Sequence, residues 1–210
     1  MRKIESVYDS VAQEYALAFA GEHDKKPQDQ EVLQKFVREV GGRGPVWDLG
    51  CGPGQTTAYL NSLGTQASGL DLSEKLLEQS RASHPGIHFR RGNILELEFR
   101  EGSIAGVVAF YAIVHFSEEQ VETALREVLR VLRPGGIFLF TFHVGGETIH
   151  IEEFLGKKID IDFMLFSTEF ILGCLEKCGF ERIEMIEREP YPGVEYPSRR
   201  AYVFARKPEV

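Results

Sequence analysis

The feature of this sequence that most constrains its fold is a regular alternation of short apolar segments and segments of helical period, which begins at Pro45. The apolar segments predict strands at 46–50, 67–72, 87–93, 104–114, 136–144, 181–189 and 200–206. The segments between them predict helices at 53–63, 73–83, 117–132 and 167–179. Alternating strands and helices form βαβ units, so the pattern predicts an α/β protein with a mostly parallel, doubly wound, seven-stranded sheet.

Both ends of the chain depart from this alternation. Residues 4–19 and 31–40 carry apolar side chains at helical spacing and predict a helical cap over residues 1–42. The last two expected strands are joined by YPGVEYPS, residues 191–198, which is too short for a crossover helix. We therefore expect these strands to form an antiparallel hairpin at the edge of the sheet.

Composition and charge argue against several classes of partner. The net charge is −8, and the basic pairs are scattered, whereas a nucleic-acid-binding surface usually gathers its lysines and arginines. No apolar run reaches the roughly eighteen residues of a membrane span, and no charged-then-apolar leader is present. The three cysteines are too few for a disulfide framework. We expect a cytoplasmic protein of one domain, residues 1–210, with no nucleic acid and no membrane as partner, and existing as a monomer or homodimer.

A glycine-rich turn marks the ligand site. In VWDLGCGPG the first expected strand ends in an acid, and three glycines follow it. Ligands of open parallel sheets bind beyond the carboxyl ends of the strands, where glycine lets the chain turn sharply and approach a ligand. An isolated turn of this kind would be equally compatible with no ligand. Asp71, which closes the next strand 21 positions after Gly50 (71 − 50), favours a nucleoside whose ribose hydroxyls it would accept.

The turn does not suit a dinucleotide. The residue after Gly52 is Pro53, which lacks the amide that a phosphate would use, and the spacing is not GxGxxG. Asp48, directly before the glycines, would repel a pyrophosphate and suits a ligand with ammonium and sulfonium charges. A nicotinamide oxidoreductase is therefore disfavoured.

With these motifs in place, the sequence resembles the class I S-adenosylmethionine-dependent methyltransferases, a family with a Rossmann-like fold. The resembling segments, in order, are YDSVAQEY (8–15), DLGCGPG (48–54), LDLS (70–73), GNI (92–94), FYAIVHF (110–116) and VLRPGG (131–136). They extend over nearly the whole chain and are specific for fold and cofactor but not for the substrate. One position departs from the family, which often has Asp where this chain has Asn93.

The resemblance implies a set of cofactor contacts. Asp48 would support the ammonium group, Asp71 would accept from both ribose hydroxyls, and the Ile94 amide would donate to the adenine ring. The full set implied for S-adenosylmethionine, or its product S-adenosylhomocysteine, is Tyr8, Tyr15, Asp48, Gly50, Cys51, Gly52, Asp71, Leu72, Asn93, Ile94 and Phe110.

Candidate catalytic residues follow the fourth and fifth expected strands. Tyr111, His115 and His143 lie there, and a neutral imidazole can take a proton near neutral pH. A base is needed only where the acceptor atom is still protonated. His143, Glu147 and His150 do not fit the donor spacing of a metal site, so we expect no metal.

Two further segments bear on the acceptor. Within the core domain, 43–210, residues 144–167 form an insert on the substrate side, in which 149–156 is expected to be a short helix or loop. The apolar side chains Phe163, Met164 and Phe166 of the insert would line a pocket or pack in the core. Arg199 or Arg200 would either lie on a surface turn or bind a substrate carboxylate, which matches the guanidinium shape.

The sequence thus predicts methyl transfer to a small organic acceptor rather than a macromolecule, because the helical cap is small and no recognition domain is appended. O-methylation is favoured first and N-methylation second. An RNA or protein methyltransferase of the same fold is the first alternative. A non-catalytic S-adenosylmethionine-binding regulator is the second, and it would bind the cofactor without turning over any acceptor.

Overall fold

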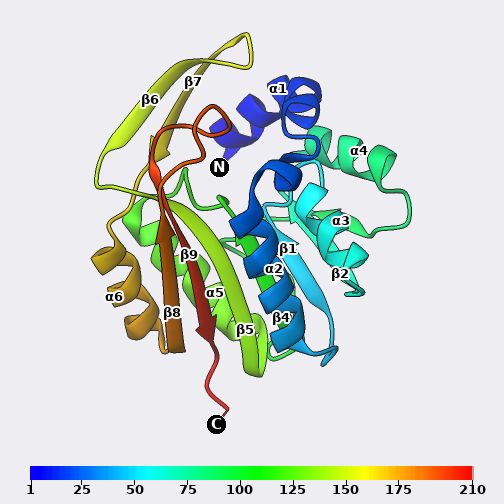
Figure 1. Ribbon diagram of the computed structural model, residues 1–210, viewed down its shortest axis with the longest axis vertical. Helices are drawn as coiled ribbons and strands as arrows, with labels where there is room; N and C mark the ends of the chain where they lie inside the picture. The colour runs from blue at the N-terminus through cyan, green and yellow to red at the C-terminus, as the bar shows by residue number, and fades with distance from the viewer. Residues whose placement is uncertain (210) are drawn as a thin grey trace.

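The computed structural model describes residues 1–209 (Figure 1). The helices are α1 (Arg2–Ala18), the 3-10 helix η1 (Glu22–Lys25), α2 (Pro27–Val40), α3 (Gln55–Ser62), α4 (Glu74–Ser83), α5 (Glu118–Val131) and α6 (Thr168–Cys178). The strands are β1 (Val46–Leu49), β2 (Ala67–Asp71), β3 (Phe89–Arg91), β4 (Ile104–Phe110), β5 (Leu132–Val144), β6 (Thr148–Phe154), β7 (Lys157–Met164), β8 (Glu181–Arg188) and β9 (Arg199–Arg206).

The predicted sheet is confirmed. Seven strands lie in the order β3-β2-β1-β4-β5-β9-β8, of which the first five run parallel. The expected C-terminal hairpin is the antiparallel pair β8–β9, and β9 inserts between β5 and β8. The helices predicted from period and capping are present, and the Ser73 and Ser117 hydroxyls accept from the amides of Leu76 and Gln120.

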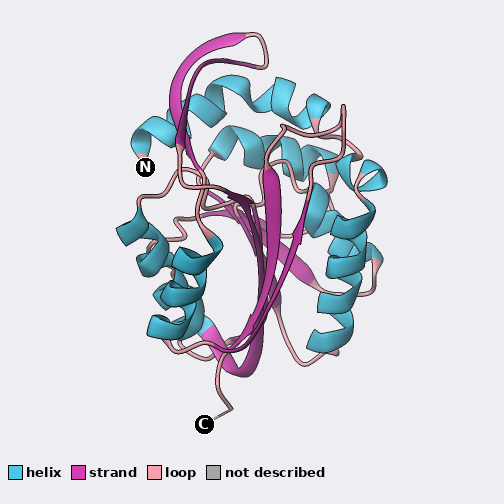
Figure 2. Cartoon of the chain, turned by 60° about the vertical axis from the view of Figure 1, so that its left-hand side comes forward, coloured by secondary structure: helices cyan, strands magenta, loops and turns pink. Residues whose placement is uncertain are grey.

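Helices cover both faces of the sheet (Figure 2). Along β5, Phe138, Phe140 and Phe142 pack in the cluster that contains α5 and α6. Ile137 and Leu139 pack in the cluster that contains α2. Because side chains alternate across a strand, β5 contributes to both cores. The helix α2, which the sequence grouped with the cap, therefore forms part of the core layer.

The segment after β5 differs from its prediction. Residues 149–156 were expected to be a short helix or loop, and this was wrong, because β6 and β7 pair as an antiparallel hairpin separate from the main sheet. Several boundaries also shift: β4 ends at Phe110 rather than 114, α3 begins at Gln55 rather than 53, and β5 begins at Leu132 rather than 136.

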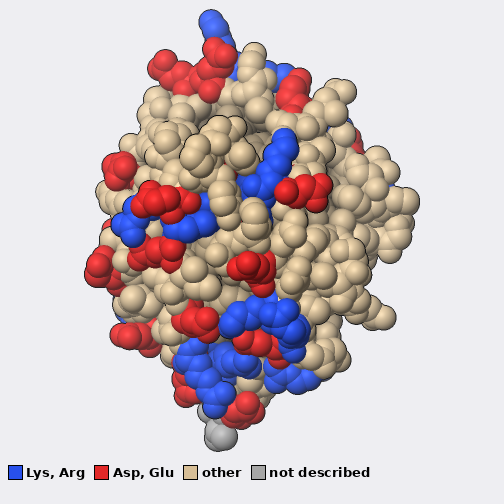
Figure 3. Space-filling model, viewed as in Figure 1, with Lys and Arg blue, Asp and Glu red and all other residues tan. Residues whose placement is uncertain are grey.

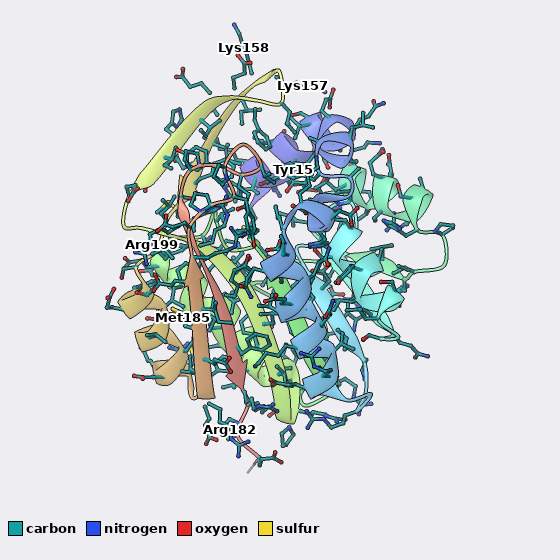
Figure 4. The ribbon with its side chains drawn as sticks, viewed as in Figure 1. Tyr15, Lys157, Lys158, Arg182, Met185 and Arg199 are labelled. Atoms are coloured by element: carbon teal, nitrogen blue, oxygen red, sulfur yellow. The ribbon has the colours of Figure 1, made fainter. Side chains whose placement is uncertain are left out.

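The hairpin β6–β7 and α1 together form an arch over the carboxyl ends of the parallel strands (Figures 1 and 4). Lys157, at the hairpin tip, donates to the Ser10 carbonyl at 2.6 Å and pairs with Glu14 at 2.9 Å. Lys3 of α1 pairs with Asp160 of β7 at 2.9 Å. We call α1 and residues 148–164 together the arch.

On the face shown in Figure 3, most Lys and Arg side chains gather at the lower end, away from the arch, and Asp and Glu side chains lie among them. Within the described residues, no helix combines the length and hydrophobicity that crossing a bilayer requires.

Candidate active site

A cavity of about 480 Å³ lies beneath the arch, at the carboxyl ends of the parallel strands. Its walls come from α1, from the glycine-rich turn after β1, from the ends of β2 and β4, and from the hairpin β6–β7. The loop between β8 and β9 closes the remaining side through Val194 and Tyr196. All fourteen residues that the sequence singled out as cofactor contacts or catalytic candidates border this one cavity: Tyr8, Tyr15, Asp48, Gly50, Cys51, Gly52, Asp71, Leu72, Asn93, Ile94, Phe110, Tyr111, His115 and His143.

The glycine-rich turn uses its amides inside the protein. The amides of Gly50 and Cys51 donate to the Leu70 carbonyl at 2.7 and 3.1 Å, and the Gly52 amide donates to Asp71 Oδ2 at 2.8 Å. Within residues 1–209, no donor reaches the Gly50 carbonyl. The turn therefore has few amides left for a phosphate, while the Gly50 carbonyl remains free to accept from a cation.

Both the backbone conformation and the neighbouring atoms require glycine at position 50. Its φ is +73°, and an added Cβ would lie 2.7 Å from Ala112 Cβ. We expect Gly50→Ala to lower the free energy of unfolding by roughly 2–4 kcal/mol, the sum of left-handed strain and steric overlap. Gly64→Ala is the matched control, because Gly64 has φ +87° with nothing within 4 Å of its Cβ position. Urea denaturation measures both, and equal losses would contradict the steric argument.

Asp71 joins the turn to the end of β2. Its Oδ2 accepts from Gly52 and its Oδ1 from the Ser73 amide, both at 2.8 Å. Burial raises the pKa of Asp71, while the backbone N–H groups of Ser73 and Gly52 oppose that rise. Each oxygen keeps a lone pair for a further donor.

Asp48 lies deeper, at 1% exposure, where its Oδ2 accepts from the Thr57 hydroxyl at 2.7 Å. Burial raises the pKa of Asp48 to about 7, although the Thr57 hydrogen bond lowers it. Gln55 lies at the start of α3, where its Nε2 donates to Glu22 Oε1 at 2.7 Å. Its Oε1 is buried without a partner in the described chain, so a second acceptor faces the cavity beside Asp48.

The opposite wall carries Asn93 and Ile94. Asn93 Oδ1 accepts from the Leu95 amide at 3.0 Å, so a further donor would share that oxygen. The Ile94 amide has no acceptor among residues 1–209. Cys51 borders the cavity, but its side chain packs against Leu77 and Phe89.

His115 connects the parts of the arch. Its Nδ1 lies 2.7 Å from the Asp162 carbonyl, which can only accept, so Nδ1 carries the proton. Its Nε2 then accepts from the Tyr8 hydroxyl at 2.8 Å. Burial lowers the pKa of His115, which keeps the ring neutral. Tyr15 projects from α1 next to Tyr8 and packs against Phe154 of β6 (Figure 4).

Tyr111 and His143 lie together at the other end of the cavity, with ring centroids 4.9 Å apart. Tyr111 has φ +52°, a strained value for a residue with a side chain, and its amide donates to Thr141 Oγ1 at 2.9 Å. Its buried hydroxyl has no partner in the described chain. His143 Nδ1 lies 2.7 Å from Ser198 Oγ, and burial with the nearby Arg200 lowers the pKa of His143 to about 4.

The remaining candidates, from the insert and the last strand, lie in three places: at the cavity, in the core and on the surface. Phe163 borders the cavity, whereas Phe166 is buried in the core. Arg200 is 3% exposed and borders the cavity. Arg199 points away from it and pairs with Glu187 and Glu189 at the edge of the sheet (Figure 4).

The sequence did not predict several residues that border the cavity: Glu22, Lys26, Gln55, Thr56 and Glu195. Lys26 belongs to one of the scattered basic pairs, Lys25–Lys26, yet it is 7% exposed. The available signal was the polar stretch GEHDKKPQDQ, residues 21–30, whose length exceeds that of a simple turn.

The chain resembles known methyltransferases in sequence. A family model described as a methyltransferase domain matches residues 46–136. A probable S-adenosylmethionine-dependent methyltransferase of Mycolicibacterium smegmatis is 29% identical over 165 residues, which cover 73% of this chain and 63% of the relative. An O-methyltransferase of Penicillium expansum is 28% identical over 181 residues, covering 79% of this chain and 65% of the relative. This chain thus spans slightly less than two thirds of these relatives.

Among solved structures, the 1,6-didemethyltoxoflavin-N1-methyltransferase of Burkholderia thailandensis, bound to 1,6-didemethyltoxoflavin and S-adenosylhomocysteine, superposes with a TM-score of 0.75. It is 18% identical, and the match covers 99% of this chain and 88% of that one. At this identity the likeness concerns the fold.

Proposed function

We propose, from the premise that the chain belongs to the class I S-adenosylmethionine-dependent methyltransferases, that it transfers a methyl group from S-adenosylmethionine to a small organic acceptor. The observation that carries this proposal is Asp71. Its two carboxylate oxygens are held by the amides of Gly52 and Ser73, at the carboxyl edge of the sheet and beside the glycine-rich turn. A fixed carboxylate of this kind is suited to the two vicinal hydroxyls of a ribose.

The cavity also suits the adenine end of the cofactor. The Ile94 amide lacks a protein acceptor, as a donor to an adenine ring nitrogen would. Leu72 and Ile94 border the cavity with apolar side chains and can pack on the two faces of a flat ring. Asn93 Oδ1 can accept from the adenine amino group while it holds the Leu95 amide.

The methionine end is matched by acceptors. Asp48, the unpartnered Gln55 Oε1 and the Gly50 carbonyl border one part of the cavity, where an ammonium group supplies three N–H donors. An ammonium there would favour the ionised form of Asp48. Tyr8 and Tyr15, which α1 holds above the turn, would shield this end from water.

When bound, the cofactor supplies a methyl group on a sulfonium, which is already an excellent leaving group. The residues of this chain then need chiefly to align the acceptor and exclude water. His115 can accept a proton only after it gives up Tyr8, since its Nδ1 donates to Asp162. We therefore propose that His115 is a positioning residue that fixes the arch. The catalytic part falls to the wall formed by Tyr111 and His143.

Binding and turnover test this proposal. We expect S-adenosylhomocysteine to bind in calorimetry and reduced nicotinamide cofactor to give no heat. With labelled S-adenosylmethionine and a host metabolite extract, mass spectrometry should reveal products heavier by one methyl group. Reactions without protein and with the surface variant Asp24→Ala serve as controls, because Asp24 is exposed and does not border the cavity.

The outcomes separate the alternatives. Cofactor binding without any product would favour a non-catalytic regulator, and label in RNA or protein would favour a macromolecular acceptor. Support for a small acceptor comes from O-methylation by the Penicillium expansum relative and N-methylation of a small molecule by the Burkholderia thailandensis protein. The interspersed acidic side chains of the surface in Figure 3 are a poor match for a polyanion.

A further inference from the structure

The end of the cavity opposite Asp71 contains two buried cations. Lys26, which precedes α2, is 7% exposed, and Arg200 of β9 is 3% exposed. Lys26 Nζ and Arg200 Cζ each lie 6.0 Å from the centroid of the Tyr111 ring. All three side chains border the cavity. We call Lys26, Tyr111 and Arg200 the cationic end of the cavity.

The carboxylates nearest this end already accept from donors of the protein. Glu22 accepts from Lys26 at 2.6 Å through Oε2 and from Gln55 at 2.7 Å through Oε1. Glu195 accepts from Arg188 at 2.6 and 2.8 Å and from the Tyr191 amide at 2.9 Å. One oxygen, Asp29 Oδ2, has no hydrogen bond, but it lies 3.7 Å from His23 Nδ1. A positively charged ligand would have to share these carboxylates with the cations that they already hold.

Donors, in contrast, remain free. Arg200 Nη1 donates to the carbonyls of Tyr196 and Ser198, and its Nε lies 3.1 Å from Glu195 Oε1. Its buried Nε has no hydrogen bond of good geometry, its Nη2 has no acceptor within residues 1–209, and the residue borders the cavity. The buried Tyr111 hydroxyl also lacks a partner there. Burying donors unpaired is costly, so both groups point to a ligand that accepts hydrogen bonds.

The backbone of Tyr111 strengthens this reading. At φ +52° the residue is strained, and the bond from its amide to the buried Thr141 hydroxyl holds it there. Strain of this kind persists where the surrounding structure over-determines it, typically at ligand sites.

The charges near this end favour a ligand with no more than one negative charge. Lys26, Arg188 and Arg200 are balanced by Glu22, Asp29 and Glu195, three cations by three carboxylates. A dianion such as a phosphate monoester would leave two charges uncompensated in a buried site. A carboxylate adds one, and its two oxygens can accept from a guanidinium and a hydroxyl together.

The walls between this end and the exterior are apolar. Ile149, Ile151 and Phe163 of the hairpin β6–β7 border the cavity. Val194 and Tyr196, which are 43% and 53% exposed, stand at its rim. An acceptor that reaches the cationic end therefore passes an apolar surface.

We propose that Arg200 and Tyr111 anchor the carboxylate of an otherwise apolar acceptor, with Lys26 contributing charge from the side. This rests on the proposed function, because it defines the acceptor of the same cavity. It assigns recognition to Arg200 rather than to Arg199, which lies on the surface.

Paired ligands of equal shape and unequal charge test the anchor. The probes are phenylacetate and phenylacetamide, titrated by ligand-observed NMR against the protein loaded with S-adenosylhomocysteine. We expect the acid to bind about tenfold more tightly than the amide, as charge-assisted hydrogen bonds allow. Tyr111→Phe should reduce acid affinity about fivefold and amide affinity by a smaller factor, because the amide oxygen accepts a hydrogen bond without charge. Its folding should be unaffected, since the lost hydroxyl has no partner in the protein.

Two further variants sharpen the result. Tyr59→Phe is the matched control, because the Tyr59 hydroxyl accepts from Gln34 and the residue does not border the cavity. Arg200→Lys keeps the charge and removes the free Nη2, so we expect it to reduce acid affinity about tenfold. Equal affinity for acid and amide, or no binding of either, overturns the proposal.

The titration is repeated without S-adenosylhomocysteine, whose own binding is measured separately. Absence of cofactor binding then counts against the proposed function. The difference between acid and amide decides the anchor in either case.

Discussion

Replacing Asp71 by alanine is expected to weaken binding of S-adenosylhomocysteine by at least about 100-fold, because two charge-assisted hydrogen bonds to the ribose are lost together. The wild-type carboxylate also holds the amides of Gly52 and Ser73 at 2.8 Å, so the variant releases the glycine-rich turn as well. Calorimetry at fixed pH and salt measures the change.

Asp71→Asn separates the two contributions. The asparagine oxygen can still accept from one of the two amides, but the charge is gone and one oxygen is replaced by a donor. We expect it to bind the ligand less tightly than wild type and more tightly than Asp71→Ala. Asp24→Ala should bind like wild type. If Asp71→Ala binds S-adenosylhomocysteine as tightly as wild type, with an unchanged circular dichroism spectrum, Asp71 does not bind the ribose.

Replacing Asp48 by asparagine is expected to have two large effects of opposite sign. Burial raises the pKa of this carboxyl from 3.8 to about 7, so the folded state binds the proton more tightly than the unfolded state. The stability contributed by the protonated form is complete below about pH 4 and is lost as the pH rises to about 7. Since asparagine does not ionise, Asp48→Asn should raise the free energy of unfolding by about 2–4 kcal/mol at about pH 8.

The same substitution should weaken cofactor binding, because an ammonium group prefers the ionised carboxylate. In the wild type, affinity for S-adenosylhomocysteine should rise as the pH increases from about 6 to about 8, while Asp48 loses its proton. The variant should lose this dependence. Urea denaturation and calorimetry at the two pH values measure both effects. A variant that is less stable than wild type at about pH 8 would contradict the argument from burial.

The sequence predicted best where structure is set by local pattern. The positions of the strands follow from apolar runs such as Ile104–Phe110, which is buried on both faces. Helix starts follow from caps, as at Ser117, whose hydroxyl accepts from Gln120. Asp71 and the glycine-rich turn meet because neighbouring parallel strands end at one edge, which topology alone requires.

Long-range pairings could not be read from the sequence. Lys26 is buried because Glu195, far away in sequence, approaches it to 3.8 Å. Arg200 rather than Arg199 faces the cavity because the register of β9 against β5 pairs Arg200 with His143. A shift of one residue would exchange the two arginines, and the buried residues that follow, 201–205, do not fix which face is which.

The hairpin β6–β7 was missed for a related reason. In IHIEEF the two adjacent glutamates interrupt the alternation, and the register shifts between Ile151 and Glu153. The hairpin is stabilised by contacts with α1 and His115 rather than by pairing with the main sheet, so its local pattern is weak.

The arch covers the cavity, so its stability bears on the exchange of ligands between the cavity and the solvent. Its ion pairs, Lys3 with Asp160 and Lys157 with Glu14, are exposed, and dissolved ions screen such pairs readily. The central sheet has no comparable sensitivity, because it rests on apolar burial. High ionic strength should therefore weaken the arch and leave the central sheet intact. We expect S-adenosylhomocysteine to dissociate faster in concentrated salt.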